Sequence, residues 1–264
     1  MYRKLSAQEL VQAKSALDLE QDFILYNSLQ LREARSFCLG DYRGEERQAF
    51  ACYLSGLPFH AFSIHLEPSR QDLERKYQAS ELLQSVCSNL RLQESSESVG
   101  YLTLPEEKAA QIELDGVQSV RTMLLMKLTD PSKLLPAQGS RLLKEHDWAA
   151  VDEFVNRVDM ISFRKEELTE FPHLGLFWQD RLVSIAGFHI FEDAYAEIGN
   201  IGTLPDHQGK GFGKRITSDI CRYGLEKTSE LYLFVFSENS PALRIYQSLG
   251  FQTVGRYSFI QFSF

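Results

Sequence analysis

A glycine-rich loop between a strand pattern and a helix pattern constrains this chain more than any other segment. The loop, residues 208–215, reads Gln-Gly-Lys-Gly-Phe-Gly-Lys-Arg and holds three glycines at alternate positions. Glycine lets the backbone turn sharply and approach a ligand closely. Free N–H groups at a helix start, together with the helix dipole, form an anion site. Lys210, Lys214 and Arg215 outnumber the one nearby carboxylate, Asp206, so the loop predicts a pyrophosphate site. A glycine turn without a ligand is the alternative.

Two other phosphate motifs fit this loop less well. A P-loop needs Ser or Thr after the Gly-Lys pair, but Arg215 stands there. A dinucleotide fingerprint reads G-x-G-x-x-G, whereas this loop reads G-x-G-x-G. The pattern Q-x-x-G-x-G does match, from Gln208 to Gly213.

The segments around the loop predict an α/β fold with antiparallel hairpins followed by a strand–helix–strand crossover. The run Leu231–Phe236 is apolar throughout, which is typical of a strand buried on both faces. A helix is expected to begin at Asn239 or Ser240 and to end at Gly250. The other expected elements are strands at 174–178, 182–191, 196–204 and 256–264 and helices at 146–158 and 213–227.

The first half of the chain predicts a separate α/β domain. Apolar spacing favours helices over Ser6–Leu39 and Asp72–Leu90, and short apolar runs favour strands at 48–54, 61–66 and 120–128. Residues 129–141 hold two prolines, a glycine and small polar residues, which is typical of a boundary. We therefore expect an N-terminal domain over 1–130, a linker over 131–141 and a C-terminal domain over 142–264.

Composition argues against several classes of partner. The net charge of −8 does not favour nucleic-acid binding, and no run of about 20 apolar residues suggests a membrane span. The charged N-terminus does not resemble a signal peptide. The four cysteines, Cys38, Cys52, Cys87 and Cys221, form no CxxC pair, so we expect no zinc site and mostly buried thiols. A reducing, cytoplasmic location is the corresponding prediction.

Two motifs together resemble the GNAT superfamily of N-acetyltransferases. The first is the Q-x-x-G-x-G loop, and the second is Asn239, Ala242, Tyr246, Gly250 and Phe251 within NSPALRIYQSLGF. They occur in the family's order, separated by a helix and a buried strand, and the resemblance covers roughly residues 142–264. It implies a central mixed, mostly antiparallel sheet flanked by helices, with acetyl-CoA as co-substrate and no metal.

The resemblance also implies a role for each matched position. Backbone groups of Ile201, Gly202 and Thr203 would pair with pantetheine, and the Ile201 N–H would polarise the thioester carbonyl. Asn239 would contact the pantetheine arm. The residues implied for the CoA pyrophosphate are Gln208, Gly209, Lys210, Gly211, Phe212, Gly213 and Lys214.

Two residues are implied for proton transfer. Tyr246 matches the family tyrosine that protonates the departing thiolate, and a phenol of pKa ~10 suits that step. Packing on an amphipathic helix is its alternative role. Glu197, eleven residues before Gln208, matches a base position that often acts through water, and a solvated carboxylate is its alternative. Glu192, Asp193 and His189 are further candidate bases.

The implied function is direct acyl transfer from acetyl-CoA, in a ternary complex, to a small-molecule or a protein or peptide amine. A non-catalytic acyl-CoA sensor or interaction module is the alternative. O-acyl transfer or a larger acyl group also stays open, depending on what Phe177, Trp178 and Phe188 line. Whether the chain forms a homodimer is open too.

The first half is similar to the N-terminal halves of two-part GNAT proteins, including those similar to glycine N-acyltransferases. The similarity lies in Phe23–Leu66, through an Asn, several aromatics and the element order. Residues 1–130 hold no second glycine loop. The resemblance therefore implies a degenerate half that is structural or that shapes the acceptor groove.

Overall fold

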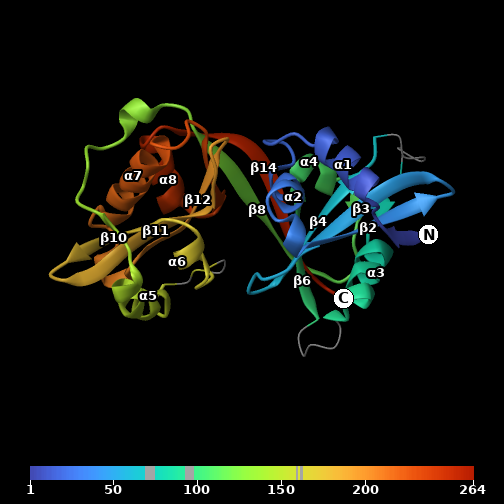
Figure 1. The fold of residues 1–264 in the computed structure, drawn as a ribbon, viewed down its shortest axis with the longest axis horizontal. Coiled ribbons are helices and arrows are strands. Elements are labelled where there is room, and N and C mark those ends of the chain that lie inside the picture. Colours follow the sequence, from blue (N-terminus) through green and yellow to red (C-terminus); the bar gives the residue numbers. More distant parts are fainter. Residues whose placement is uncertain (69–74, 93–97, 159, 161–162) are drawn as a thin grey trace. The chain divides into compact units, whose positions relative to one another are not determined.

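The computed structural model describes residues 1–68, 75–92, 98–158, 160 and 163–264. The chain divides into two compact units (Figure 1): unit 1 holds Met1–Met123 and Gly255–Phe264, and unit 2 holds Leu124–Val254. This division differs from the expected one because the end of β14 (Phe251–Ser263) pairs antiparallel with β6 (Val99–Pro105) in unit 1.

Unit 2 is built around a mixed sheet with helices on both faces. Around β12 the strand order is β8, β13, β12, β11, β10, β9. Helices α7 and α8 lie on one face of β10–β12, and α5 and α6 lie on the other (Figure 1). The elements are β8 (Val117–Leu128), β9 (Arg141–Leu142), α5 (Trp148–Val155), α6 (Glu167–Glu170), β10 (His173–Trp178), β11 (Arg181–Phe191), β12 (Ala196–Thr203), α7 (Phe212–Leu225), β13 (Leu231–Phe236) and α8 (Ser240–Ser248).

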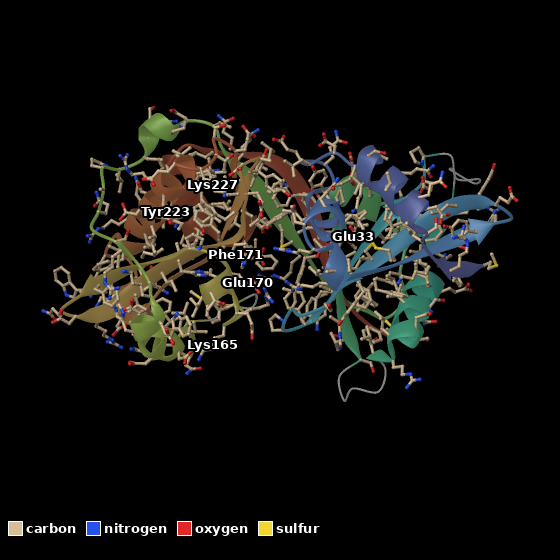
Figure 2. All side chains as sticks on the ribbon, viewed as in Figure 1. Glu33, Lys165, Glu170, Phe171, Tyr223 and Lys227 are labelled. Carbon is tan, nitrogen blue, oxygen red and sulfur yellow. A yellow bond between two sulfur atoms is a disulfide. The ribbon has the colours of Figure 1, made fainter. Side chains whose placement is uncertain are left out.

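Apolar periodicity explains how α7 is held against this sheet. Ile216 and Ile220, one helical turn apart, are fully buried in the core of unit 2. Gly224, a turn further on, lets the helix approach β13, because a Cβ there would lie 2.9 Å from Leu231 Cδ2. Tyr223 and Lys227 mark the end of this helix in Figure 2. The spacing thus fixes which face of α7 meets the sheet.

Unit 1 repeats the order of elements seen in unit 2. Each unit has an antiparallel hairpin, a third strand, a helix and a strand parallel to the third: β4 pairs with β6, and β12 with β13. The mixed α/β fold class is thereby confirmed, in both units. Unit 1 comprises β1 (Tyr2–Lys4), α1 (Ala7–Ala16), α2 (Phe23–Gln30), β2 (Ser36–Arg43), β3 (Glu46–Leu54), β4 (His60–Leu66), β5 (Tyr77–Gln78), α3 (Ser80–Leu90), α4 (Glu106–Ala109) and β7 (Ile112–Glu113), with β6, the end of β14 and most of β8.

Two helix predictions in unit 1 extend too far. The helix expected over Ser6–Leu39 is two helices followed by β2, because residues 36–43 pair with β3 across a turn in which Gly44 has φ +62°. The helix expected from Asp72 begins at Ser80, and residues 72–74 lie outside the described part of the chain. Apolar spacing alone did not separate short strands from helix ends.

The segment expected as a linker, residues 131–141, packs on unit 2. The carboxylate of Asp219 on α7 accepts hydrogen bonds from the backbone N–H groups of Gln138 (2.9 Å) and Ser140 (3.1 Å). Leu134 and Leu135 pack against the core of the same unit. Residues 131–141 therefore form an ordered segment over α7, which we call the strap. The buried carboxylate of Asp219 satisfies two backbone N–H groups of this strap.

The cysteine prediction is wrong for one pair. Cys38 and Cys52 lie directly opposite each other in β2 and β3 and form a disulfide. Cys87 and Cys221 are buried thiols, as expected. The pairing could not be read from spacing, because it depends on the register of two strands. None of the helices in the described ranges is both long and apolar enough to cross a bilayer.

Tyr257 ties the C-terminal strand into unit 1, and its removal should destabilise the protein. The buried phenol donates to the Glu20 carbonyl (2.9 Å) and accepts from the Phe23 N–H (2.9 Å). Tyr257→Phe removes both of these hydrogen bonds, so we expect a loss of about 1–3 kcal/mol in unfolding free energy. Denaturant unfolding would measure it, with Tyr101→Phe as the control because the Tyr101 ring stacks on Phe259. Equal stability in both variants would contradict this assignment.

Candidate active site

The open edge of β12 is the first feature of the candidate site. β12 pairs in parallel with β13 from Ala196 to Ile198, opposite Leu231 to Leu233. Both strands continue beyond this point, but no further pairs between them occur in the described part of the chain. The backbone of residues 199–203 on that edge can therefore hydrogen-bond to a ligand.

A bulge interrupts β12 at the same place. Gly199 lies opposite Gly187, whereas Gly202 lies opposite Ile185, so β12 holds one additional residue. Asn200 has φ +51°, a left-handed conformation that is uncommon for a residue other than glycine. Because a bulge redirects the backbone groups beside it, it can turn the Ile201 N–H out of the regular ladder.

The glycine loop begins α7 as expected. Gly209 and Gly211 have φ +74° and +83°, and a Cβ at either position would meet no atom within 4 Å. Gly211 is the N-cap of α7 and supplies no side-chain cap for the first-turn N–H groups. The loop thus combines left-handed glycines, open space and uncapped donors, which is the geometry of an anion site.

Charged side chains around the loop are divided between internal contacts and the surface. Asp206, the one carboxylate, lies 3.2 Å from His207 Nδ1 and 3.3 Å from Arg181 Nη1. The neighbouring His207 side chain lowers the pKa of Asp206. Lys210 Nζ donates to the Asp206 carbonyl (2.9 Å), and Arg215 Nη2 donates to the Gln138 carbonyl (2.9 Å). The negative charge of Asp206 is therefore already compensated, and the loop keeps a positive balance.

Helix α8 brings Tyr246 and Asn239 to the same part of unit 2. Ile245 lies beside the start of α7, since a Cβ at Gly213 would lie 3.5 Å from its Cδ1. Asn239 caps α8 by accepting the Ala242 N–H (3.2 Å). Tyr246 is buried, which raises the pKa of its phenol. The phenol therefore stays protonated over the whole physiological range, as a proton donor must.

The candidate bases differ in their surroundings. Glu197 is buried on β12, opposite Ile190. Asp193 is 93% exposed and pairs with Lys227, and Glu192 is also exposed, so both are turn residues in solvent. His189 is partly buried on β11, and its Nδ1 lies 3.0 Å from Glu167 Oε2.

Phe188 and Trp178, two of the aromatic residues considered for an acyl pocket, lie in different surroundings. Phe188 is fully buried and packs on Phe191 and Tyr223. Trp178 is 52% exposed and lies 6.1 Å, centroid to centroid, from Phe212. They therefore form no common lining for a long acyl chain.

Sequence reasoning missed three buried polar residues at the bulge, namely Glu167, His173 and Asn200. Asn200 Nδ2 donates to Glu167 Oε2 (2.9 Å) and lies 3.3 Å from His173 Nε2. The only signal was the Gly-Asn pair inside a strand pattern, which can mark a bulge. Among the described residues, no group of three His, Cys, Asp or Glu side chains is arranged to hold a metal ion.

A known family matches the part of the chain that holds the candidate site, and known proteins are similar to this chain. The Acetyltransferase (GNAT) family matches residues 141–251. A spermine/spermidine N(1)-acetyltransferase of Bacillus subtilis is 30% identical over 104 residues, covering 36% of this chain and 68% of that protein. A mycothiol acetyltransferase of Actinosynnema mirum is 30% identical over 118 residues, covering 44% of this chain. The chain spans about a third of that relative's length, 34%.

Solved structures share the fold over the entire chain. An acetyltransferase from the GNAT family of Colwellia psychrerythraea has a TM-score of 0.63 at 16% identity and covers 100% of both chains. A tandem GNAT protein from the clavulanic acid biosynthesis pathway has a TM-score of 0.62 at 14% identity, covering 100% of this chain and 98% of that one. Taken with the relative that is two-thirds covered, these matches establish that the chain belongs to the GNAT family of acetyltransferases.

Proposed function

We propose that the chain transfers an acetyl group from acetyl-CoA to an amine acceptor in a ternary complex. The observation that carries this proposal is the left-handed Gly209–Gly211 loop, which opens α7 without a side-chain cap. Unit 2 also has the unpaired edge of β12, a second place for backbone hydrogen bonds to a ligand. The family relation supports the same co-substrate.

Each part of acetyl-CoA has a proposed place in unit 2. The pyrophosphate binds the backbone N–H groups from Gly209 to Lys214, and Gln208 precedes them. Pantetheine pairs with the backbone of Ile201, Gly202 and Thr203, with Asn239 beside its arm. The Ile201 N–H, redirected by the bulge, stabilises the oxyanion that forms on the thioester carbonyl.

The chemistry is a direct displacement. The amine lone pair forms a C–N bond to the acetyl carbonyl carbon, and the C–S bond breaks. The departing thiolate takes a proton from Tyr246. Two residues of unit 2 are candidates for the group that takes the amine proton: Glu197, directly or through water, and His189.

Tyr246→Phe should lower turnover and leave cofactor binding intact. The phenol is the proposed proton donor, and general acid catalysis contributes roughly 10²–10⁴-fold. We therefore expect kcat to fall by about 100-fold or more, while Kd for acetyl-CoA stays roughly constant. Steady-state kinetics and calorimetry separate the two effects. An unchanged kcat would assign Tyr246 to packing alone.

The acceptor is proposed as an amine, either a small molecule or a peptide N-terminus or side chain. A named relative acts on spermine and spermidine, and others carry the name mycothiol acetyltransferase. Calorimetric titration of acetyl-CoA, followed by a CoA-release assay with a panel of amines that includes spermine, tests the proposal. Micromolar binding with CoA release supports it. Absence of acetyl-CoA binding overturns it, and binding without release for every amine would favour an acyl-CoA sensor.

A further inference from the structure

A buried polar cluster lies beside the bulge in β12, on the face of the sheet that α6 covers. It consists of Glu167 on α6, His173 on β10, His189 on β11 and Asn200 on β12. Glu167 and His173 are only 3% and 2% exposed. Four polar side chains from four elements are costly to bury unless their hydrogen bonds are arranged consistently.

Glu167 fixes the orientation of His189. Its carboxylate accepts from Asn200 Nδ2 (2.9 Å), His189 Nδ1 (3.0 Å) and Arg164 Nε (3.2 Å). Burial alone raises the pKa of Glu167, but these donors, His189 first, hold it at about 2. Glu167 is therefore a carboxylate and only accepts, so the hydrogen on the His189 ring is at Nδ1. Any further proton the ring takes up goes to Nε2.

The second imidazole is fixed as a neutral ring. His173 Nδ1 lies 3.0 Å from the Phe171 carbonyl, which can only accept, so Nδ1 carries the hydrogen. Nε2 then accepts from Asn200 Nδ2. Burial lowers the pKa of His173, which keeps it neutral. His173 therefore orients the Asn200 amide, which in turn holds Glu167. Glu170 and Phe171, labelled in Figure 2, mark the end of α6, the helix that carries Glu167.

The reactive edge of His189 lies against β12. A Cβ built on Gly199 would be 2.1 Å from both Nε2 and Cδ2 of His189, so only glycine leaves room for the ring. Gly199 is the residue immediately before the bulge, and Ile201, two residues on, is the proposed oxyanion donor. Nε2 thus faces the strand segment at which the thioester carbonyl is proposed to bind.

We propose that His189, oriented by Glu167, takes the proton from the attacking amine; this rests on the proposed acyl transfer. An ammonium acceptor loses two protons in forming the amide. One passes to His189 Nε2 and then to solvent, and the other returns to the Tyr246 oxygen, replacing the proton that Tyr246 gives to the sulfur. The Glu167 carboxylate stabilises the imidazolium formed in between, as a carboxylate does beside a catalytic imidazole. Glu167 is a positioning residue.

The competing base, Glu197, lacks this arrangement. In the described part of the chain no hydrogen bond orients its carboxylate, although strand alternation places it on the same face as Gly199. Among the described residues, the titratable and charged groups near His189 include Glu167 from α6, Arg164 from the turn before it, His173 from β10 and Glu197 from β12.

The first test replaces the proton-accepting atom and keeps the structural bond. In His189→Asn, the amide can still donate to Glu167 but cannot take a proton. We expect kcat/KM for acetyl transfer to spermine to fall about 100-fold or more, with acetyl-CoA affinity and thermal stability roughly unchanged. His146→Asn is the control, since His146 is 69% exposed. Full activity in His189→Asn overturns the inference.

The second test removes the charge that stabilises the imidazolium. In Glu167→Gln, the acid limb of the pH–rate profile should move to lower pH by about one unit, because a neutral partner no longer favours the protonated ring. Glu170→Gln, on the same helix and paired with Arg164 at 2.9 Å, should leave the limb in place. NMR titration of the imidazole signals should show the same shift for His189 without any acceptor.

The possible outcomes distinguish a failure of this inference from a failure of the proposed function. Loss of the acid limb in Glu197→Gln but not in His189→Asn would overturn the inference and leave acyl transfer standing. If the wild-type protein binds acetyl-CoA but acetylates no amine, the proposed function fails and the inference falls with it.

Discussion

Gly211→Glu is expected to weaken acetyl-CoA binding by about 100-fold or more. Gly211 has φ +83° and is the N-cap of α7, in a loop where a Cβ meets no neighbour. A glutamate there places a negative charge beside the proposed pyrophosphate site, and like charges at a binding surface cost several kcal/mol. Each 1.4 kcal/mol is tenfold in Kd. Calorimetric titration of acetyl-CoA measures the change.

A matched variant separates charge at the site from backbone strain. Gly44 in unit 1 also has a positive φ, +62°, and equal open space around its Cβ position. Gly44→Glu therefore introduces the same residue and similar strain in the other unit, and it should bind acetyl-CoA as the wild type does. Retained affinity in Gly211→Glu, with both variants folded, would mean that CoA does not use this loop.

Gly250→Ala is expected to be among the most destabilising single substitutions in the chain. Gly250 has φ +97°, and a Cβ there would lie 2.1 Å from the Asp130 carbonyl oxygen, a backbone atom that cannot move aside as a side chain can. The Gly250 carbonyl also accepts from the N–H groups of Thr129 and Asp130. Strain and overlap together should cost about 3 kcal/mol or more.

Thermal unfolding would show this loss as a fall of about 6 °C or more in Tm. Gly139→Ala is the control, because Gly139 has φ +81° with no atom within 4 Å of its Cβ position. It carries the left-handed strain without the overlap and should cost only about 1 kcal/mol. Equal losses in the two variants would show that contact with Asp130 is unimportant.

The parts of the site that the sequence predicted are local in the chain. The glycine loop, the Asn239 cap and the Gly250 stop depend on residues within a few positions of each other, so their chemistry can be read directly. The strands around β12 follow from alternation and from one continuous apolar run. The order of these elements along the chain is also the order expected for the family, which reduced the number of folds that fit the sequence.

The features that the sequence did not predict depend on distant residues. Glu167 and Asn200 are 33 positions apart, and neither stands out in its own segment. The Cys38–Cys52 bond depends on a strand register, and the strap over α7 depends on one buried carboxylate, Asp219. A sequence pattern indicates which face of a helix or strand is buried and where turns occur. These contacts depend instead on which strands become neighbours in the sheet.

The placement of β14 affects how the protein can be made. Its residues 255–263 complete unit 1 by pairing with β6, yet they are translated long after β6 has left the ribosome. Until then, β6 is an open sheet edge in the nascent chain, a template for pairing with other strands. Unit 1 therefore cannot complete its sheet until unit 2 has been synthesised, and a product that stops before β14 leaves that edge exposed to aggregation.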